Sequence, residues 1–221
     1  MGSKYKDKYL GTFGLASFFS MYFGHHLSTI EGGFINTDDE DFYYALLMMR
    51  SHGWTRDLPL HKQTEYQSKY KVSTFDNLYN FYLPGMNLRS TDLQAYIGLR
   101  AIDKLDNFSK IRNSNFNYYI NNIKNNELNI QVNPNDFVSN FAMPIISKNR
   151  ENILENLLKN NIECRPLIAG NLANKPFWYE NFTKPELKNC ELIDQYGFYI
   201  PNHQDLTKND LNKIIEIVNN E

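Results

Sequence analysis

The chain has 221 residues, of which 42% are hydrophobic and 22% are charged, and its formal net charge is -2. A chain of this length can bury a core in one or two domains, and its near-neutral charge argues against a nucleic-acid partner, which needs concentrated basic residues. No apolar run approaches the roughly 20 residues that cross a bilayer, so we expect no membrane segment.

The two cysteines, Cys164 and Cys190, lie far apart and form no Cys-x-x-Cys pair. This spacing suits a reducing cytoplasm and argues against a disulfide scaffold or a cysteine-rich zinc site. The amino terminus carries no apolar stretch of the signal-peptide type. We therefore expect a cytoplasmic protein without a metal site.

Apolar patterns and capping signals predict alternating strands and helices. Thr37 with Glu40, and Thr91 with Gln94, have the spacing of capping boxes, so a helix should begin at each. The polar residues 58–74 have no clear period and predict a surface loop. In chain order, we expect a buried strand at 11–19, a strand at 31–36, helices after the two capping boxes, a strand at 137–146, a helix over 153–158, a strand at 197–200 and a last helix capped by Thr207.

The first of these helices should bury one apolar face and stop near Gly53. Its residues at helical spacing are Phe42, Ala45, Leu46 and Met49. A shift in composition and a long helical region predict a domain boundary at about 110–130. The pattern favours a mixed α/β chain with a small C-terminal α+β unit.

The most specific segment lies between the first two predicted strands. It holds the hydroxyl of Ser20, the neighbouring imidazoles of His25 and His26, and the glycine pair Gly32 and Gly33. Links at strand ends are where α/β proteins gather their active groups. The alternative is that the two histidines are surface groups or make ordinary hydrogen bonds, because their spacing matches no standard metal motif.

This segment resembles the cofactor-lysine region of the DegT-type sugar-nucleotide aminotransferase family. The family pattern is a serine, a few residues, a lysine and then a Thr-x-Glu-Gly-Gly strand. Ser20 matches the serine, residues 29–33 match the strand, and His25 stands where the lysine would be. Further segments are similar in the family's order, at 50–56 (Arg-x-His-Gly), 85–95 (Asn-x-Arg-x-Thr-Asp-x-Gln-Ala), 162–167 and 199–202.

The resemblance implies a fold and a cofactor. The family uses pyridoxal phosphate (PLP) on the aspartate-aminotransferase fold. The implied fold class is α/β: residues 1–115 would form the C-terminal part of the PLP-binding large domain, and residues 116–221 a small C-terminal α+β domain.

The histidine in place of the family's lysine has a direct chemical consequence. Only a primary amine can bind PLP covalently, and no lysine lies between Lys8 and Lys62. The resemblance therefore implies that PLP or pyridoxamine phosphate is held non-covalently and that His25 is the base that takes the C4′ proton. Imidazoles have an ordinary pKa of about 6.5, which suits such a step. A hydroxyl beta to the new imine can then leave.

That chemistry is similar to the 3-dehydratase branch of the family. This branch acts on 4-keto-6-deoxy nucleotide sugars and also has His-His at this position. Residues 165–171 resemble the same branch. The implied substrate is therefore a nucleotide sugar.

Other site residues follow from the resemblance. Ser20 would donate to the cofactor phosphate, and Asn87 would reach the phosphate held in a neighbouring subunit, which requires a dimer. Arg89 and Arg165 would bind anionic parts of the substrate, or each could form an ordinary ion pair. His26 is grouped with these substrate-binding residues, and two roles are open for it: orienting His25, or packing.

The chain begins after several features of the family. The aspartate for the pyridine nitrogen, the aromatic residue that stacks on the cofactor and the phosphate loop all lie upstream of the matched region. The chain is therefore expected to be the C-terminal part of such an enzyme. Three interpretations follow: a sugar dehydratase, a sugar aminotransferase-like protein, and a non-catalytic module that pairs with itself or with an N-terminal-half chain.

Overall fold

The chain is organised in two units. The computed structural model describes residues 1–127, 130, 132–133 and 135–220. One unit joins Met1–Leu10 to Lys104–Glu221, and the other is Gly11–Asp103. The predicted domain boundary between residues 115 and 116 lies within helix α4 (Leu105–Asn122) and stays a prediction.

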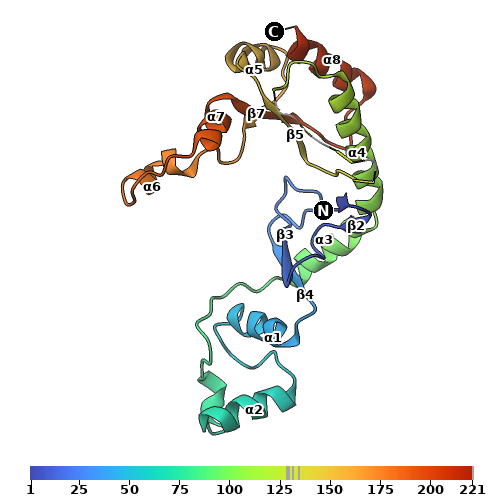
Figure 1. Ribbon diagram of the computed structural model, residues 1–221. Helices are drawn as coiled ribbons and strands as arrows, with labels where there is room; N and C mark the ends of the chain where they lie inside the picture. Colours follow the sequence, from blue (N-terminus) through green and yellow to red (C-terminus); the bar gives the residue numbers. More distant parts are fainter. Residues whose placement is uncertain (128–129, 131, 134, 221) are drawn as a thin grey trace. The chain divides into compact units, whose positions relative to one another are not determined.

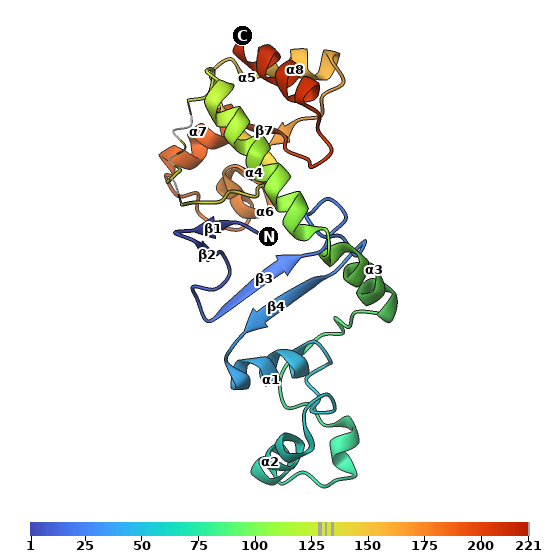
Figure 2. The same ribbon diagram turned by 90° about the vertical axis from the view of Figure 1, so that its right-hand side faces the viewer.

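The unit of residues 11–103 is built on a two-stranded hairpin. Strands β3 (Ala16–Ser20) and β4 (Gly33–Thr37) are antiparallel, with Ala16 opposite Thr37 and Ser20 opposite Gly33. Figure 2 shows the hairpin leading into α1, with α3 beside the connection between the strands. The remaining elements are α1 (Glu40–Met49), α2 (Leu60–Tyr70), the 3-10 turn η1 (Asp76–Tyr79) and α3 (Asp92–Ile102).

The core of this unit is small. Tyr44 and Met48 of α1 pack with Leu58 in one buried cluster. The buried face of α1 differs from the predicted one, since Met49 of the predicted face is exposed while Met48 is fully buried. The helix also ends at Met49, ahead of the predicted stop near Gly53.

The other unit is a helix-covered sheet. Its three strands are antiparallel in the order β5-β7-β6, and β7 is central. Alternate residues of the strands face the helices, because Met143 and Ile145 of β5 are buried beside Phe198 and Ile200 of β7. Its elements are β1 (Lys4–Tyr5), β2 (Lys8–Tyr9), α4, β5 (Ala142–Ile146), α5 (Arg150–Lys159), β6 (Arg165–Pro166), the 3-10 turn η2 (Leu172–Asn174), α6 (Pro176–Tyr179), α7 (Lys188–Tyr196), β7 (Gly197–Pro201) and α8 (Lys208–Asn219).

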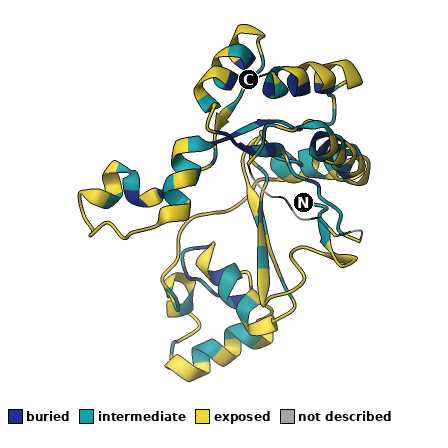
Figure 3. Ribbon diagram, turned by 45° about the horizontal axis from the view of Figure 1, so that its top comes forward, coloured by how far each residue is buried: buried dark blue, intermediate teal, exposed yellow. Residues whose placement is uncertain are grey.

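The core of this unit lies between the sheet and three helices. It joins α4, α5 and α8 to the strands through large apolar side chains, among them Tyr119, Leu157 and Val218. Figure 1 shows α5 and α8 on one side of β5 and β7, and Figure 3 shows the buried positions gathered there. Helix α8 confirms the predicted last helix, with Thr207 as its cap.

Three predictions about local structure were wrong. Residues 60–70 of the predicted loop form α2, which has no buried residue and therefore no apolar period to detect. Asp39, rather than Thr37, caps α1, because the Asp39 carboxylate accepts from the Phe42 amide at 2.7 Å. The Thr37 hydroxyl accepts from the Asp39 amide and donates to the carbonyl of Leu15. The strand predicted at 11–19 begins only at Ala16 and is not buried, since the Phe18 side chain is 84% exposed.

Candidate functional site

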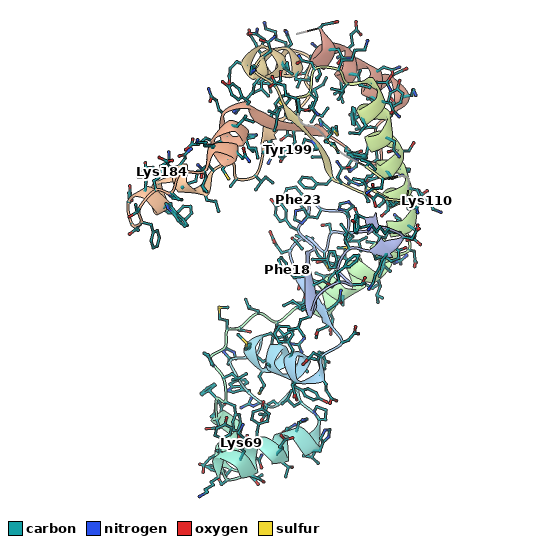
Figure 4. The ribbon with its side chains drawn as sticks, in the orientation of Figure 1. Phe18, Phe23, Lys69, Lys110, Lys184 and Tyr199 are labelled. Carbon is teal, nitrogen blue, oxygen red and sulfur yellow. The ribbon has the colours of Figure 1, made fainter. Side chains whose placement is uncertain are left out.

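The connection between β3 and β4 holds two predicted site residues, His25 and His26, and follows a third, Ser20, which ends β3. Its two ends are joined by backbone hydrogen bonds, from the Met21 amide to the Gly32 carbonyl (2.8 Å) and from the Thr29 amide to the Met21 carbonyl (2.9 Å). Leu27 and Thr29 are buried within it. Figure 4 shows Phe18 on the hairpin and Phe23 in the connection above it.

The Thr-x-Glu-Gly-Gly sequence suits this connection physically. The Thr29 hydroxyl donates to the Glu31 carbonyl at 2.8 Å. Gly32 has φ +141°, and a Cβ there would come within 2.8 Å of the Thr29 hydroxyl. Ile30 has φ 73°, a conformation that is unfavourable for a β-branched residue. The strained backbone at Ile30 is thus flanked by the buried Thr29, whose hydrogen bond to the Glu31 carbonyl spans it.

Helix α3 supports the connection from outside. Gln94, in the confirmed capping box with Thr91, donates its side-chain amide to the Glu31 carbonyl at 2.7 Å. A Cβ on Gly98 would lie 3.3 Å from the Thr29 methyl, so the helix approaches closely.

Ser20 and His25 are linked through Tyr22. The Ser20 hydroxyl accepts from the Tyr22 amide at 3.2 Å, and the His25 amide donates to the Tyr22 carbonyl at 3.0 Å. The His25 ring lies 5.8 Å from the Tyr22 ring, edge on. Both His25 and His26 are half-buried. The backbone thus places His25 and His26 one short turn after Ser20 in the chain.

A cavity of about 1320 Å³ lies beside this hairpin, bordered by β3, β4, α1 and residues 84–90. Three predicted site residues, Ser20, Asn87 and Arg89, line it together. His25 and His26 are not among its lining residues. Leu46 and Met49, on the predicted face of α1, do line it, which explains why that face is not covered by the core.

The position of Asn87 and Arg89 depends on a backbone ladder. Ser51 and Asn87 form an antiparallel bridge, and the Leu88 amide donates to the Arg50 carbonyl at 2.9 Å. The two segments lie so close together that a Cβ on Gly85 would come within 2.4 Å of the Gly53 nitrogen. The two segments that resemble the family, 50–56 and 85–95, are therefore neighbours.

A polar network that was not predicted lies behind this ladder. The Arg89 Nε donates to the Ser51 hydroxyl at 3.0 Å, which donates to Asp57 Oδ2 at 2.9 Å. Arg50 Nη2 approaches the same carboxylate oxygen at 3.4 Å. Arg50 also lines the cavity. The signal that could have identified Arg50 and Ser51 is their place in the Arg-x-His-Gly segment.

Arg165 lies in the other unit, on β6. Its guanidinium is paired with the Glu163 carboxylate, through Nε at 2.9 Å and through Nη2. The ion pair that was the alternative for this residue is therefore present.

The segment after Arg165 is held by acidic groups of α7. Asp194 accepts from the Asn174 side chain at 2.9 Å, from the Lys175 ammonium at 3.0 Å and from the Asn171 amide at 3.1 Å. The hydrogen bond from Asn174, with those from Lys175 and Asn171, lowers the pKa of Asp194 although partial burial opposes it.

Three further features bear on function. Among the described residues, no group of three or more His, Cys, Asp or Glu side chains has metal-site geometry. Of the helices that the structure describes, none is both long and apolar enough to span a membrane. Cys164 and Cys190 are free thiols.

Comparison with known proteins identifies the relatives of this arrangement. A family model for the DegT/DnrJ/EryC1/StrS aminotransferase family matches residues 1–219. The chain belongs to this family. It is 35% identical over 213 residues to the GDP-4-keto-6-deoxy-D-mannose 3-dehydratase of Escherichia coli O55:H7 (strain CB9615 / EPEC), which covers 92% of this chain and 54% of the relative.

Two further matches support the same relationship. The protein of the same name from Yersinia pseudotuberculosis is 34% identical over 213 residues, covering 92% of this chain and 53% of the relative. A solved structure of the E. coli 3-dehydratase with bound hydrated PLP matches with a TM-score of 0.84 and 34% identity, over 99% of this chain and 58% of that one.

The agreement confirms the family resemblance and the α/β fold class, that of the PLP-dependent transferases. The chain spans about half the length of the curated relatives it matches.

Proposed function

We propose that this chain forms part of a nucleotide-sugar 3-dehydratase, with a 4-keto-6-deoxy nucleotide sugar as substrate and His25 as the base. The observation that carries the proposal is the histidine at the lysine position of the family's cofactor motif, in a chain whose relatives include two 3-dehydratases. The proposal keeps the cytoplasmic location expected from the two unpaired cysteines.

The residues along the cavity suit a phosphorylated pyridine cofactor, PLP or pyridoxamine phosphate. The Ser20 hydroxyl accepts a hydrogen bond from one amide and retains its own hydrogen as a donor. Asn87 also lines this cavity, where its amide is available to the phosphate held in a neighbouring subunit. No lysine is found among the described residues that line it. Such a donor set favours a cofactor held by non-covalent contacts.

In this proposal each residue has a separate task. When bound, the cofactor supplies a primary amine for the keto sugar and a ring that delocalises the electron pair released on proton loss. His25 takes and returns a proton at its imidazole, and His26 holds that ring in place. Ser20 binds the cofactor phosphate, while Arg89 and Arg165 bind anionic parts of the substrate.

The proposed assembly needs a second chain. Asn87 would contact the phosphate held in a neighbouring subunit, so the proposed unit is a homodimer or a complex with an N-terminal-half chain.

The test is a titration of the purified chain with pyridoxamine phosphate, followed by absorbance and calorimetry, for wild type, His25→Ala and His26→Ala. We expect micromolar binding that His25→Ala weakens or alters spectroscopically, with a smaller effect of His26→Ala. Conversion of the 4-keto-6-deoxy nucleotide sugar into a 3-deoxy nucleotide sugar would then support dehydration.

Two results would contradict the proposal. Glutamate-dependent transfer of an amino group to the sugar would identify an aminotransferase-like protein. Absence of cofactor binding, combined with stable pairing to itself or to an N-terminal-half chain, would identify a non-catalytic module.

A further inference from the structure

The charge along the cavity in residues 11–103 is of one sign. Among the described residues that line it, the charged side chains are Arg50 and Arg89, and no carboxylate is present. Asp57, the carboxylate that contacts Arg50, is not part of the lining. The cavity therefore favours an anion.

The two arginines belong to one hydrogen-bonded unit. Ser51 is 1% exposed, and its hydroxyl connects the Arg89 Nε (3.0 Å) to Asp57 Oδ2 (2.9 Å), the oxygen that Arg50 Nη2 approaches at 3.4 Å. One carboxylate thus contacts the Arg50 guanidinium directly and is connected to the Arg89 guanidinium through Ser51, and the three charged groups together carry a net charge of about +1. Because Arg89 uses Nε for Ser51, its Nη groups are left as donors.

Backbone contacts also hold Arg50 and Arg89 near each other. The bridge between Ser51 and Asn87 and the bond from the Leu88 amide to the Arg50 carbonyl place the two arginines on adjacent segments. The Trp54 ring lies 5.7 Å from the Arg89 guanidinium carbon and adds a second support for it. A pre-positioned pair of guanidinium groups binds an anion at a lower entropic cost than mobile side chains do.

We propose that Arg50 and Arg89 together bind a phosphoryl group, with Ser51 and Asp57 as positioning residues. Guanidinium groups match phosphate oxygens in a bidentate way, and the Ser20 and Ser90 hydroxyls on the same cavity supply further donors. The inference rests on the proposed function for the molecule that carries this group: the phosphate of the cofactor or the diphosphate of the nucleotide sugar.

The test measures binding of three phosphate probes by calorimetry with the full chain: inorganic diphosphate, GDP and pyridoxamine phosphate. Guanosine and pyridoxamine are the phosphate-free counterparts. We expect Arg50→Met and Arg89→Met each to weaken binding of inorganic diphosphate by about tenfold or more. Arg100→Met is the matched control, because Arg100 is an exposed arginine of α3 that contacts Tyr96 instead.

The positioning role has its own readout. Ser51→Ala should weaken diphosphate binding severalfold in the wild-type background and have almost no further effect in an Arg89→Met background, since it acts through Arg89. An equal effect in both backgrounds would mean a general structural role and would overturn this part of the proposal.

The outcomes separate the sources and the proposals. Arginine-dependent binding of GDP alone assigns the site to the substrate, and arginine-dependent binding of pyridoxamine phosphate alone assigns it to the cofactor. Diphosphate binding that persists without any His25-dependent cofactor binding leaves this inference standing while the proposed function fails. Wild-type affinity of Arg50→Met, equal weakening by Arg100→Met, or no binding of any phosphate probe would overturn the inference.

Discussion

Gly32 shows how a single residue sets the shape of the site. Its positive φ and its short distance to the Thr29 hydroxyl leave no room for a side chain, and Ile30 beside it is already strained. The sequence pattern predicted that this segment is special. It could not predict the hydrogen bond between Ser51 and Arg89, because these residues lie 38 positions apart.

We expect Gly32→Ala to lower the free energy of unfolding by about 1–3 kcal/mol, because the new methyl group meets Thr29 in an unfavourable backbone conformation. Urea unfolding measures this difference. Gly24→Ala is the matched control in the same connection, since a Cβ there meets nothing closer than 3.7 Å. Equal stability of the two variants would contradict the argument.

Asp194 predicts a pH dependence of stability. Hydrogen bonds from Asn174 and Lys175 lower its pKa in the folded chain, so the unfolded chain binds its proton at a higher pH. The resulting stabilisation is complete above the ordinary carboxyl pKa of about 4 and is lost as the pH falls through the lowered value.

The prediction is that Asp194→Asn is less stable than wild type at pH 7, and that the gap narrows as the pH falls below about 4. Chemical unfolding at a series of pH values checks it. A difference in stability between the two proteins that stays constant to low pH would show that the charge of Asp194 does not contribute to stability.

At the scale of elements, short-range signals were the reliable ones. The capping box of Thr91 and Gln94 and the Thr207 cap were correctly predicted because both depend on neighbours in sequence. The prediction of Thr37 as a cap was wrong because Asp39, two positions later, accepts the hydrogen bond of the first-turn amide of Phe42. Helix α2 was missed because its polar side chains are helix formers without a buried face.

Helix α8 should depend on its cap. Thr207→Ala removes the acceptor for the Asp210 amide, and we expect it to cost about 1 kcal/mol of stability. Thr207→Ser keeps the hydroxyl and should cost much less. Thermal unfolding of both variants tests this, and an equal loss for Ala and Ser would contradict a capping role.

At the scale of the whole molecule, large apolar side chains remain exposed in residues 11–103. Phe18 is 84% and Leu99 is 70% exposed, and neither belongs to a buried cluster. Apolar surface of this kind marks interaction sites. The family and the fold could be predicted from local motifs, but the exposure of these side chains depends on which chains surround them.

We expect the chain to associate with itself as its concentration rises, and Phe18→Ser with Leu99→Ser to reduce that association. Sedimentation velocity over a range of concentrations measures it. Leu158→Ser, at a 59% exposed position of α5, is the control and should leave association unchanged. A monomer at every concentration would contradict the expectation.

The pairing of residues 4–6 with residues 136–137 has a consequence for synthesis. Lys4 and Phe137 exchange backbone hydrogen bonds of 2.7 and 3.0 Å, and Lys6 binds Asp136 across 130 positions. A ribosome makes residues 11–103 before it makes Asp136 and Phe137, so that unit can fold while residues 4–6 still lack these partners. Residues 4–6 thus take their place in the fold only after residues 136 and 137 have been made.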